Sequence, residues 1–221
     1  MNEGTEMTVA TSALIDHMHD DVTERLRSDI VLGALRPGEW LRQIDLQDRY
    51  NCTRSAARTA LATLASAHIV EHTPNRGFRV VQPSVEARSE ITDVRLMLEL
   101  PAAVEIVTNA SAADIADIRV AADAFDAGVD VLSVQKMRSL NHRFHRALIA
   151  PLQNTTLASL IHELRERDLP GDWSNWTTTS KVRQSSRDHL DMADAIEAGD
   201  AHALQVIIKA HLTRWQTTEV D

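Results

Sequence analysis

Apolar side chains recur at helical spacing along most of the chain. This spacing predicts helices over residues 15–32, 44–50 and 53–67, because positions three or four apart share one helix face. Two short segments, 69–72 and 78–81, alternate apolar and polar residues instead, and a Pro-Asn-Arg-Gly turn lies between them. The first 82 residues are therefore predicted to form three helices plus a two-stranded wing, which is a winged helix-turn-helix.

From residue 83 onward nearly every segment has helical periodicity. Pro83 ends the second wing strand and Ser84 can cap the next helix, so a domain boundary is expected at this point. Pro101 is expected to kink or interrupt the first helix of the second domain. Six helices are predicted, over residues 85–110, 112–127, 132–150, 157–169, 181–198 and 201–215, with a loop at 170–179.

The predicted fold class is therefore mostly α. Residues 1–14 show no clear period and are expected to form a flexible tail. Residues 15–82 are predicted to form the winged helix-turn-helix domain, and residues 83–221 an all-helical bundle. Trp173, Trp176 and Trp215 are expected to cover the bundle or a dimer surface.

Composition excludes several other classes of protein. No apolar run approaches the ~18 residues of a membrane span, and the N-terminus lacks the basic and then apolar pattern of a signal peptide. The one cysteine, Cys52, rules out an intramolecular disulfide and favours a reducing cytoplasm. The net charge of −9 argues against a nucleic-acid partner, but residues 36–82 hold seven arginines and four acidic residues, a local charge of +3.

Cationic side chains cluster at the start of the helix predicted over residues 53–67. Arg54 and Arg58 lie in its first turn and a half, and Thr53 can cap its N-terminus. Cations at this end oppose the helix dipole, so they suit contact with an external anion such as a DNA phosphate better than they suit stability. An ordinary corner between two helices with solvated arginines is the alternative. Arg76, at the tip of the predicted wing, has no packing role to explain it.

Three histidines of the second domain fall on otherwise apolar helix faces. His145 shares its face with Asn141, four residues earlier, and His189 and His211 lie on the stripes of two further helices. Buried imidazoles need partners, and a divalent metal satisfies several at once, at ~2.0–2.1 Å for zinc. Two alternatives stay open: histidines that are simply packed in a helical protein, and a metal-dependent enzyme whose histidine cluster activates water. An enzyme would need a general base beside the histidines, and no residue is well placed for this role. An enzyme would also leave the predicted winged helix-turn-helix domain unexplained.

The segment GALRPGEWLRQIDLQDRYNCTRSAARTALATLASAHIVEHTPNRGFRV, residues 33–80, resembles the DNA-binding domain of the GntR family of bacterial transcription regulators. The resemblance rests on a Leu-x-Pro-Gly turn, a Ser/Thr-Arg-x-x-x-Arg helix start and an Arg-Gly wing. It implies that Arg54 and Arg58 reach the major groove, where arginine forms paired hydrogen bonds with guanine.

The same resemblance assigns further DNA contacts. The residues it implicates are Thr53, Arg54, Ser55, Arg58, Thr59, Arg76 and Gly77. The hydroxyl groups are implied to bond phosphates, and the two wing residues to approach the adjacent minor groove or backbone. Arg42 and Arg49 are additional candidates for phosphate contact, with a plain solvated charge as the equal alternative.

Three segments of the second domain resemble the FCD effector domain of FadR-type GntR regulators. They contain the family's Asp-x-x-Phe-His pattern as residues 141–145, a histidine (His189) ahead of an Ala-Ile-x-x-Gly-Asp run, and a closing His-Leu at His211. The resemblance implies a divalent metal, with zinc or nickel favoured, held by His145, His189, His211 and Asn141. Asn141 stands where the pattern has aspartate, so the site loses a negative charge and some affinity, or uses Asn141 only to orient a ligand.

Arg95 matches the family arginine that faces the effector cavity. With Asn141 it is the candidate for binding a small carboxylate, by paired hydrogen bonds beside an open metal position. A salt bridge from Arg95 to Glu99, four residues later, is the alternative.

Together these features predict a ligand-responsive bacterial transcription regulator without catalytic residues. A cytoplasmic homodimer is expected to bind a palindromic DNA operator, with no membrane partner. A small organic acid in the helical domain is expected to control binding, and repression relieved by ligand is the more usual mode in this family.

Overall fold

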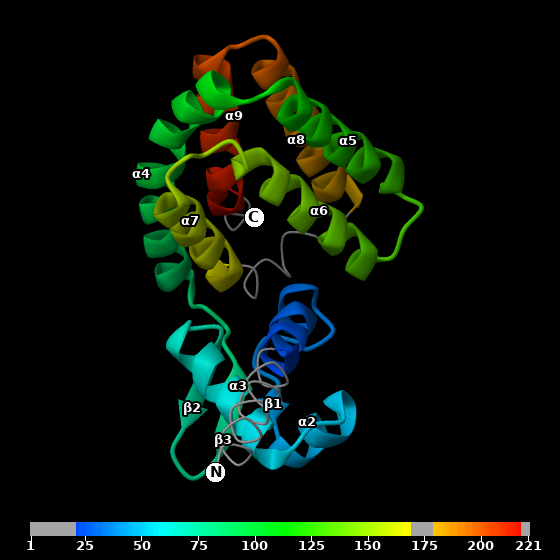
Figure 1. The fold of residues 1–221 in the computed structure, drawn as a ribbon, viewed down its shortest axis with the longest axis vertical. Coiled ribbons are helices and arrows are strands. Elements are labelled where there is room, and N and C mark those ends of the chain that lie inside the picture. The colour runs from blue at the N-terminus through cyan, green and yellow to red at the C-terminus, as the bar shows by residue number, and fades with distance from the viewer. Residues whose placement is uncertain (1–20, 169–178, 218–221) are drawn as a thin grey trace, which may run out of the picture. The chain divides into compact units, whose positions relative to one another are not determined.

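The computed structural model describes residues 21–168 and 179–217 of the chain (Figure 1). The chain divides into two compact units, and the division falls between Gln82 and Pro83. The tail expected at residues 1–14, most of the loop expected at 170–179, and Trp173 and Trp176 lie outside the described residues.

Helices and a small sheet form the first unit. A helix over residues 21–31 is followed by α2 (Gln43–Tyr50) and α3 (Arg54–Ser66). Asn51, with φ of 50°, ends α2 in the left-handed conformation and turns the chain toward α3. Apolar residues of these helices and of the sheet form one core, which includes Leu26, Leu61, Leu64, Ile69 and Val80.

The sheet has the strand order β1-β3-β2 and is antiparallel. Its strands are β1 (Trp40–Leu41), β2 (Val70–Thr73) and β3 (Gly77–Val80). The predicted winged helix-turn-helix is confirmed, with one addition: β1 pairs with β3, so the wing has three strands. A strand of two residues is too short to show an alternating pattern in the sequence.

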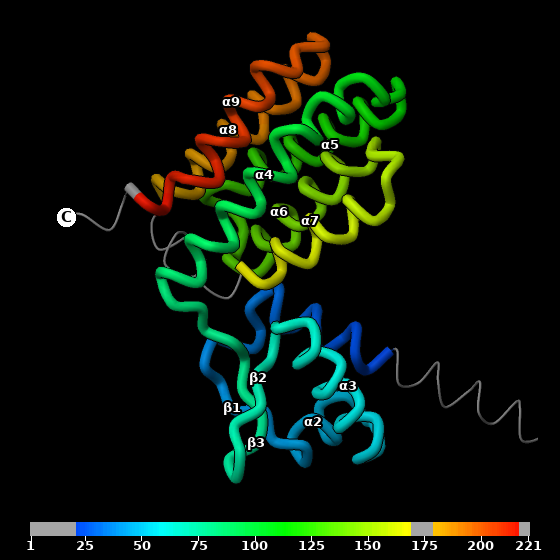
Figure 2. The backbone as a smooth tube through the Cα atoms, turned by 90° about the vertical axis from the view of Figure 1, so that its left-hand side faces the viewer, coloured from blue at the N-terminus to red at the C-terminus, as the bar shows by residue number. Residues whose placement is uncertain are grey.

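The second unit is a helical bundle, as predicted (Figures 1 and 2). Its described helices are α4 (Val85–Asn109), α5 (Ala112–Gly128), α6 (Val134–Ile149), α7 (Thr155–Asp168), α8 (Thr179–Glu197) and α9 (Ala201–Thr213), followed by the 3-10 turn η2 (Arg214–Thr217). Side chains of Ser84, Ser111, Ser133 and Asp200 cap four of these helices.

In the bundle, α4 has one helix packed on each side. Figure 2 shows α4 running between α7 and α9, both of which it contacts, while α5 packs on α6 and α8. Pro101 does not interrupt α4, which continues to Asn109. Phe125, Phe144 and Leu204 are fully buried in the interior. Trp215 is also buried, and its indole nitrogen donates to the Thr92 hydroxyl at 3.2 Å, so it covers the bundle.

Membrane-spanning helices require a long apolar stretch. None of the described helices has the length and hydropathy to cross a bilayer.

Candidate nucleic-acid interface and candidate metal centre

The start of α3 is exposed and cationic. The Thr53 hydroxyl caps the helix by accepting a hydrogen bond from the Ala56 backbone N–H at 3.1 Å. The side chains of Arg54 and Arg58 are exposed, and Nε of Arg54 donates to Oε1 of Gln43 on α2 at 3.2 Å. The opposite face of α3, which includes Leu61 and Leu64, is buried. One helix therefore packs the core with one face and presents its arginines with the other.

Most other residues predicted to contact DNA are also exposed. Ser55 and Thr59 lie on the exposed side of α3, and Arg42 precedes α2. Arg76 lies at the wing tip, where its guanidinium is 4.7 Å from the centre of the Trp40 ring. Gly77 follows with φ of 99°, a conformation that favours glycine.

Arg49 is engaged differently from the other predicted DNA contacts. Its Nη2 atom lies 2.8 Å from Oδ2 of Asp29, and the Tyr50 hydroxyl donates to the same carboxylate oxygen at 2.8 Å. This pair links α2 to the helix over residues 21–31. The structure therefore gives Arg49 a packing role within the first unit.

Three histidines from different helices meet inside the second unit. His145 of α6, His189 of α8 and His211 of α9 each offer a ring nitrogen, and these three atoms lie within 4.8 Å of one another. Their ring centres are 5.0–5.5 Å apart. Ligands at ~2.0–2.1 Å from a tetrahedral zinc lie about 3.3 Å apart, so small side-chain rotations would bring these nitrogens onto one ion.

His189 gives the strongest indication that the cluster holds a ligand. Its side chain is 0% exposed, and neither Nδ1 nor Nε2 has a hydrogen-bond partner among the described residues. Burying an unpaired polar group costs about 1–3 kcal/mol. A cation bound to one of these nitrogens would remove part of that cost, so the residues present fit a divalent metal.

The electrostatic environment keeps the buried imidazoles neutral. Burial, followed by the positive charge of Arg165, holds the pKa of His145 well below its usual range. Burial, His211 and Arg165 do the same to the pKa of His189. Neutral imidazole is the form that binds metals, because its lone pair is free.

The two other candidates of this site, Asn141 and Arg95, are both buried. Asn141 lies one helical turn before His145 on α6. Arg95 on α4 donates from Nε to Glu99 at 2.7 Å and from Nη1 to Asp168 of α7 at 3.1 Å. The salt bridge to Glu99 is therefore formed, and a second carboxylate joins it. Arg95 also contributes to the lowered pKa of His145, so its charge acts on the cluster.

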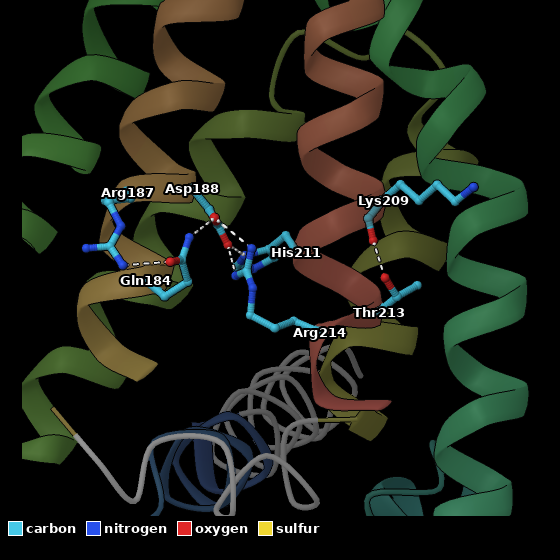
Figure 3. A network of polar contacts seen from close by, with 7 residues as sticks. All are labelled: Gln184, Arg187, Asp188, Lys209, His211, Thr213 and Arg214. Atoms are coloured by element: carbon cyan, nitrogen blue, oxygen red, sulfur yellow. Dashed lines mark hydrogen bonds and ion pairs between the residues drawn. The ribbon is translucent and has the colours of Figure 1, made fainter. Parts of the chain in front are cut away.

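Asp188 and Arg165 belong to this site and were not predicted from the sequence. Oδ2 of Asp188 lies 2.8 Å from Nδ1 of His211, in a network with Gln184 and Arg214 (Figure 3). Arg165 is buried on α7 and affects the pKa of both His145 and His189. The carboxylate places a hydrogen-bond acceptor directly behind one of the histidines.

A winged helix-turn-helix followed by an all-helical bundle defines a class of protein, the DNA-binding transcription regulators with a second helical domain. Comparison with known families agrees: residues 18–80 match the gntR family of bacterial regulatory proteins, and residues 90–214 match the FCD domain. The chain belongs to the GntR family and carries an FCD domain.

Individual relatives of this chain are also named as transcription regulators. The chain is 26% identical over 204 residues to the HTH-type transcriptional regulator BphR of Paraburkholderia xenovorans (strain LB400), covering 86% of this chain and 80% of the relative. It is 24% identical over 179 residues to the Nta operon transcriptional regulator of Aminobacter aminovorans, covering 81% and 83%. The family and these relatives are transcription regulators and not enzymes.

Solved structures share the fold. McbR/YncC of Escherichia coli superimposes with a TM-score of 0.80 at 20% sequence identity, covering 90% of this chain and 95% of that one. A GntR regulator from Rhodococcus sp. RHA1 gives a TM-score of 0.76 at 21% identity, covering 90% and 95%. At these identities the likeness shows the fold alone.

Proposed function

We propose that this DNA-binding regulator is a repressor whose histidine cluster, with a divalent metal, binds a small carboxylate effector. The observation that carries the proposal is His189, a fully buried imidazole beside His145 and His211, whose two nitrogens have no hydrogen-bond partner in the part of the chain that the structure describes. Zinc and nickel suit three neutral imidazoles better than a hard, oxygen-preferring cation does.

In the DNA-binding unit, we assign base contacts to Arg54 and Arg58 and backbone contacts to the polar residues around them. Both arginines are exposed at the N-terminal end of α3, the part of a recognition helix that meets base edges. Arg76 and Gly77 at the wing tip, and Arg42 ahead of α2, supply further contacts. Arg49 is the weakest candidate because its guanidinium binds Asp29.

In the helical unit, a bound metal would offer a coordination position to an effector carboxylate. Asn141 supplies an amide oxygen on the same helix face as His145. Arg95 would stabilise the effector's charge, and its two present carboxylate partners, Glu99 and Asp168, hold the guanidinium in place. The effector can shift DNA binding only by its difference in affinity for the two states of the protein.

A thermal-shift screen tests the effector and the metal together. Small carboxylates are added with and without zinc or nickel, and the unfolding midpoint is measured. A ligand at one hundred times its Kd stabilises the folded state by about 2.7 kcal/mol, so a carboxylate is expected to raise the midpoint more when metal is present. If neither metal changes the midpoint at any carboxylate concentration, the metal-dependent sensor is wrong.

A homodimer is part of the proposal, and an exposed apolar stripe on α4 is its best-supported surface. Val94, Met97 and Val104 are 43%, 72% and 48% exposed, and with the exposed Pro101 they repeat every three or four residues. Reading a two-fold operator requires a second copy, and a stripe with this spacing can pack against itself around a two-fold axis.

The stripe gives a direct prediction. The double variant Val94→Asp, Met97→Asp is expected to be monomeric, because carboxylates would face each other across the contact. Light scattering after size-exclusion chromatography measures the mass. Val120→Asp, at a 52% exposed position on α5, is the matched control and should leave the mass unchanged. A double variant that keeps the mass of the parent would rule out this stripe.

A further inference from the structure

Asp188 is a buried carboxylate between α8 and α9. Its residue is 3% exposed, and Oδ2 lies 2.8 Å from Nδ1 of His211 (Figure 3). Arg214 binds both carboxylate oxygens, through Nη1 to Oδ2 and through Nη2 to Oδ1 at 3.0 Å. Gln184 donates to Oδ1 at 3.0 Å. Three side chains therefore hold the carboxylate: Gln184, His211 and Arg214.

These contacts determine which nitrogen of His211 carries the proton. Arg214 pairs with both oxygens of Asp188 and Gln184 donates to one of them, so every neighbour other than His211 treats the group as an ionised carboxylate. An ionised carboxylate only accepts hydrogen bonds. Nδ1 of His211 must therefore donate, so Nε2 is the nitrogen that can bind a cation when the ring is neutral.

The charge of the cluster adds a second argument. Three imidazole ligands and Asn141 carry no negative charge to balance a divalent ion. Asp188 carries one, and its side chain is 5% exposed, whereas the side chain of Arg214 that pairs with it is 36% exposed and better screened by water. Seen from the cluster, the carboxylate therefore outweighs the guanidinium.

We propose that Asp188 is a positioning residue of the metal site. It orients His211, and through that side chain it supplies the negative charge that is absent at Asn141. This inference rests on the proposed metal-binding function. A carboxylate behind a histidine ligand orients the ring and makes it a stronger donor to the metal.

The first test needs no metal. Long-range 1H–15N NMR of protein labelled in histidine reports the tautomer of each ring, and His211→Gln identifies the signal. We expect His211 to carry its proton on Nδ1, and Asp188→Ala to lose that preference because the acceptor is gone. A wild-type His211 protonated on Nε2 alone would overturn the proposal.

The second test is calorimetric titration with zinc and with nickel. Asp188→Asn keeps the shape of the side chain and is expected to weaken metal binding by about 10–100-fold. Asp191→Asn, which removes an exposed carboxylate from the same helix, is the matched control and should bind like the wild type. Equal affinity of Asp188→Asn and the wild type overturns the inference alone. A wild type that binds neither metal overturns the proposed function, and the inference with it.

A rescue experiment separates this role from a merely structural one. Asn141→Asp restores a carboxylate among the candidate ligands, so in the Asp188→Asn background it is expected to recover at least tenfold in metal affinity. Asn141→Asp in the wild-type background is the control, and its gain in affinity is expected to be smaller there, because Asp188 already supplies the charge. An equal gain in both backgrounds would mean that the two carboxylates do not replace each other. Absence of rescue in a double variant that is folded by circular dichroism would also count against the inference.

Discussion

Replacing Arg54 or Arg58 with alanine is expected to abolish sequence-specific DNA binding while the protein stays folded and dimeric. One well-placed arginine–guanine pair contributes about 1–3 kcal/mol of discrimination, and a two-fold complex loses two pairs for each substitution, which corresponds to an affinity loss of about 30-fold to more than 10,000-fold. Neither side chain packs in the core, since both are exposed on α3. The unfolding midpoint should therefore change little.

Fluorescence anisotropy with an operator selected from random duplexes measures this effect. The salt concentration must be fixed, because phosphate contacts make the affinity steeply dependent on salt. Arg143→Ala removes an exposed positive charge from the helical unit and is the control for net charge. If both Arg54→Ala and Arg58→Ala keep the operator affinity, α3 does not read the DNA.

Arg49→Ala should behave in a different way from these two variants. The substitution breaks the ion pair between Arg49 and Asp29, so the hydrogen bond from the Tyr50 hydroxyl is the remaining link from α2 to that carboxylate. The expected loss is in the stability of the first unit more than in sequence preference.

The second large effect is expected at His189. His189→Leu should abolish the stabilisation by zinc or nickel, because it removes one of three imidazoles, and should raise the unfolding midpoint of the metal-free protein. Leucine removes two buried nitrogens that have no partner within residues 21–168 and 179–217, and burying each such group costs about 1–3 kcal/mol. The opposing loss is the ring stacking on Phe144, at 4.0 Å between centres, worth about 0.5–1.5 kcal/mol.

Differential scanning calorimetry with a chelator gives the unfolding midpoint of the metal-free protein, and repeating it with each metal gives the stabilisation by that metal. His202→Leu changes an exposed histidine on α9 and should leave the metal response intact. A metal response in His189→Leu equal to that of the wild type would remove His189 from the site. A lower midpoint without metal would mean that the imidazole has a structural role in the core.

Helical periodicity explains why much of the fold and of the histidine cluster could be predicted. A period of 3.6 residues tells which side chains share a face, so the buried side of α3 and the inward position of His145, His189 and His211 could be deduced within single helices. The capping serines mark the helix starts for the same local reason. What periodicity does not tell is which helices lie beside one another.

The missed features all depend on contacts between elements far apart in the chain. The Glu99 partner of Arg95 is four residues away and could be predicted, whereas Asp168 is 73 residues away and could not. Asp188 did leave a signal, because it shares a helix face with the buried Met192 and Ala195. A lone carboxylate on an apolar face indicates a partner on a neighbouring helix.

The division of α3 into two faces has a consequence for how such a regulator can evolve. The buried residues are Ala56, Ala57, Ala60, Leu61 and Leu64, and the exposed ones at its start are Arg54, Ser55, Arg58 and Thr59. No residue belongs to both sets, and surface substitutions usually change stability by no more than about 0.5 kcal/mol. Gene duplicates of this regulator could therefore acquire new target sequences through the exposed set while their folding remains intact.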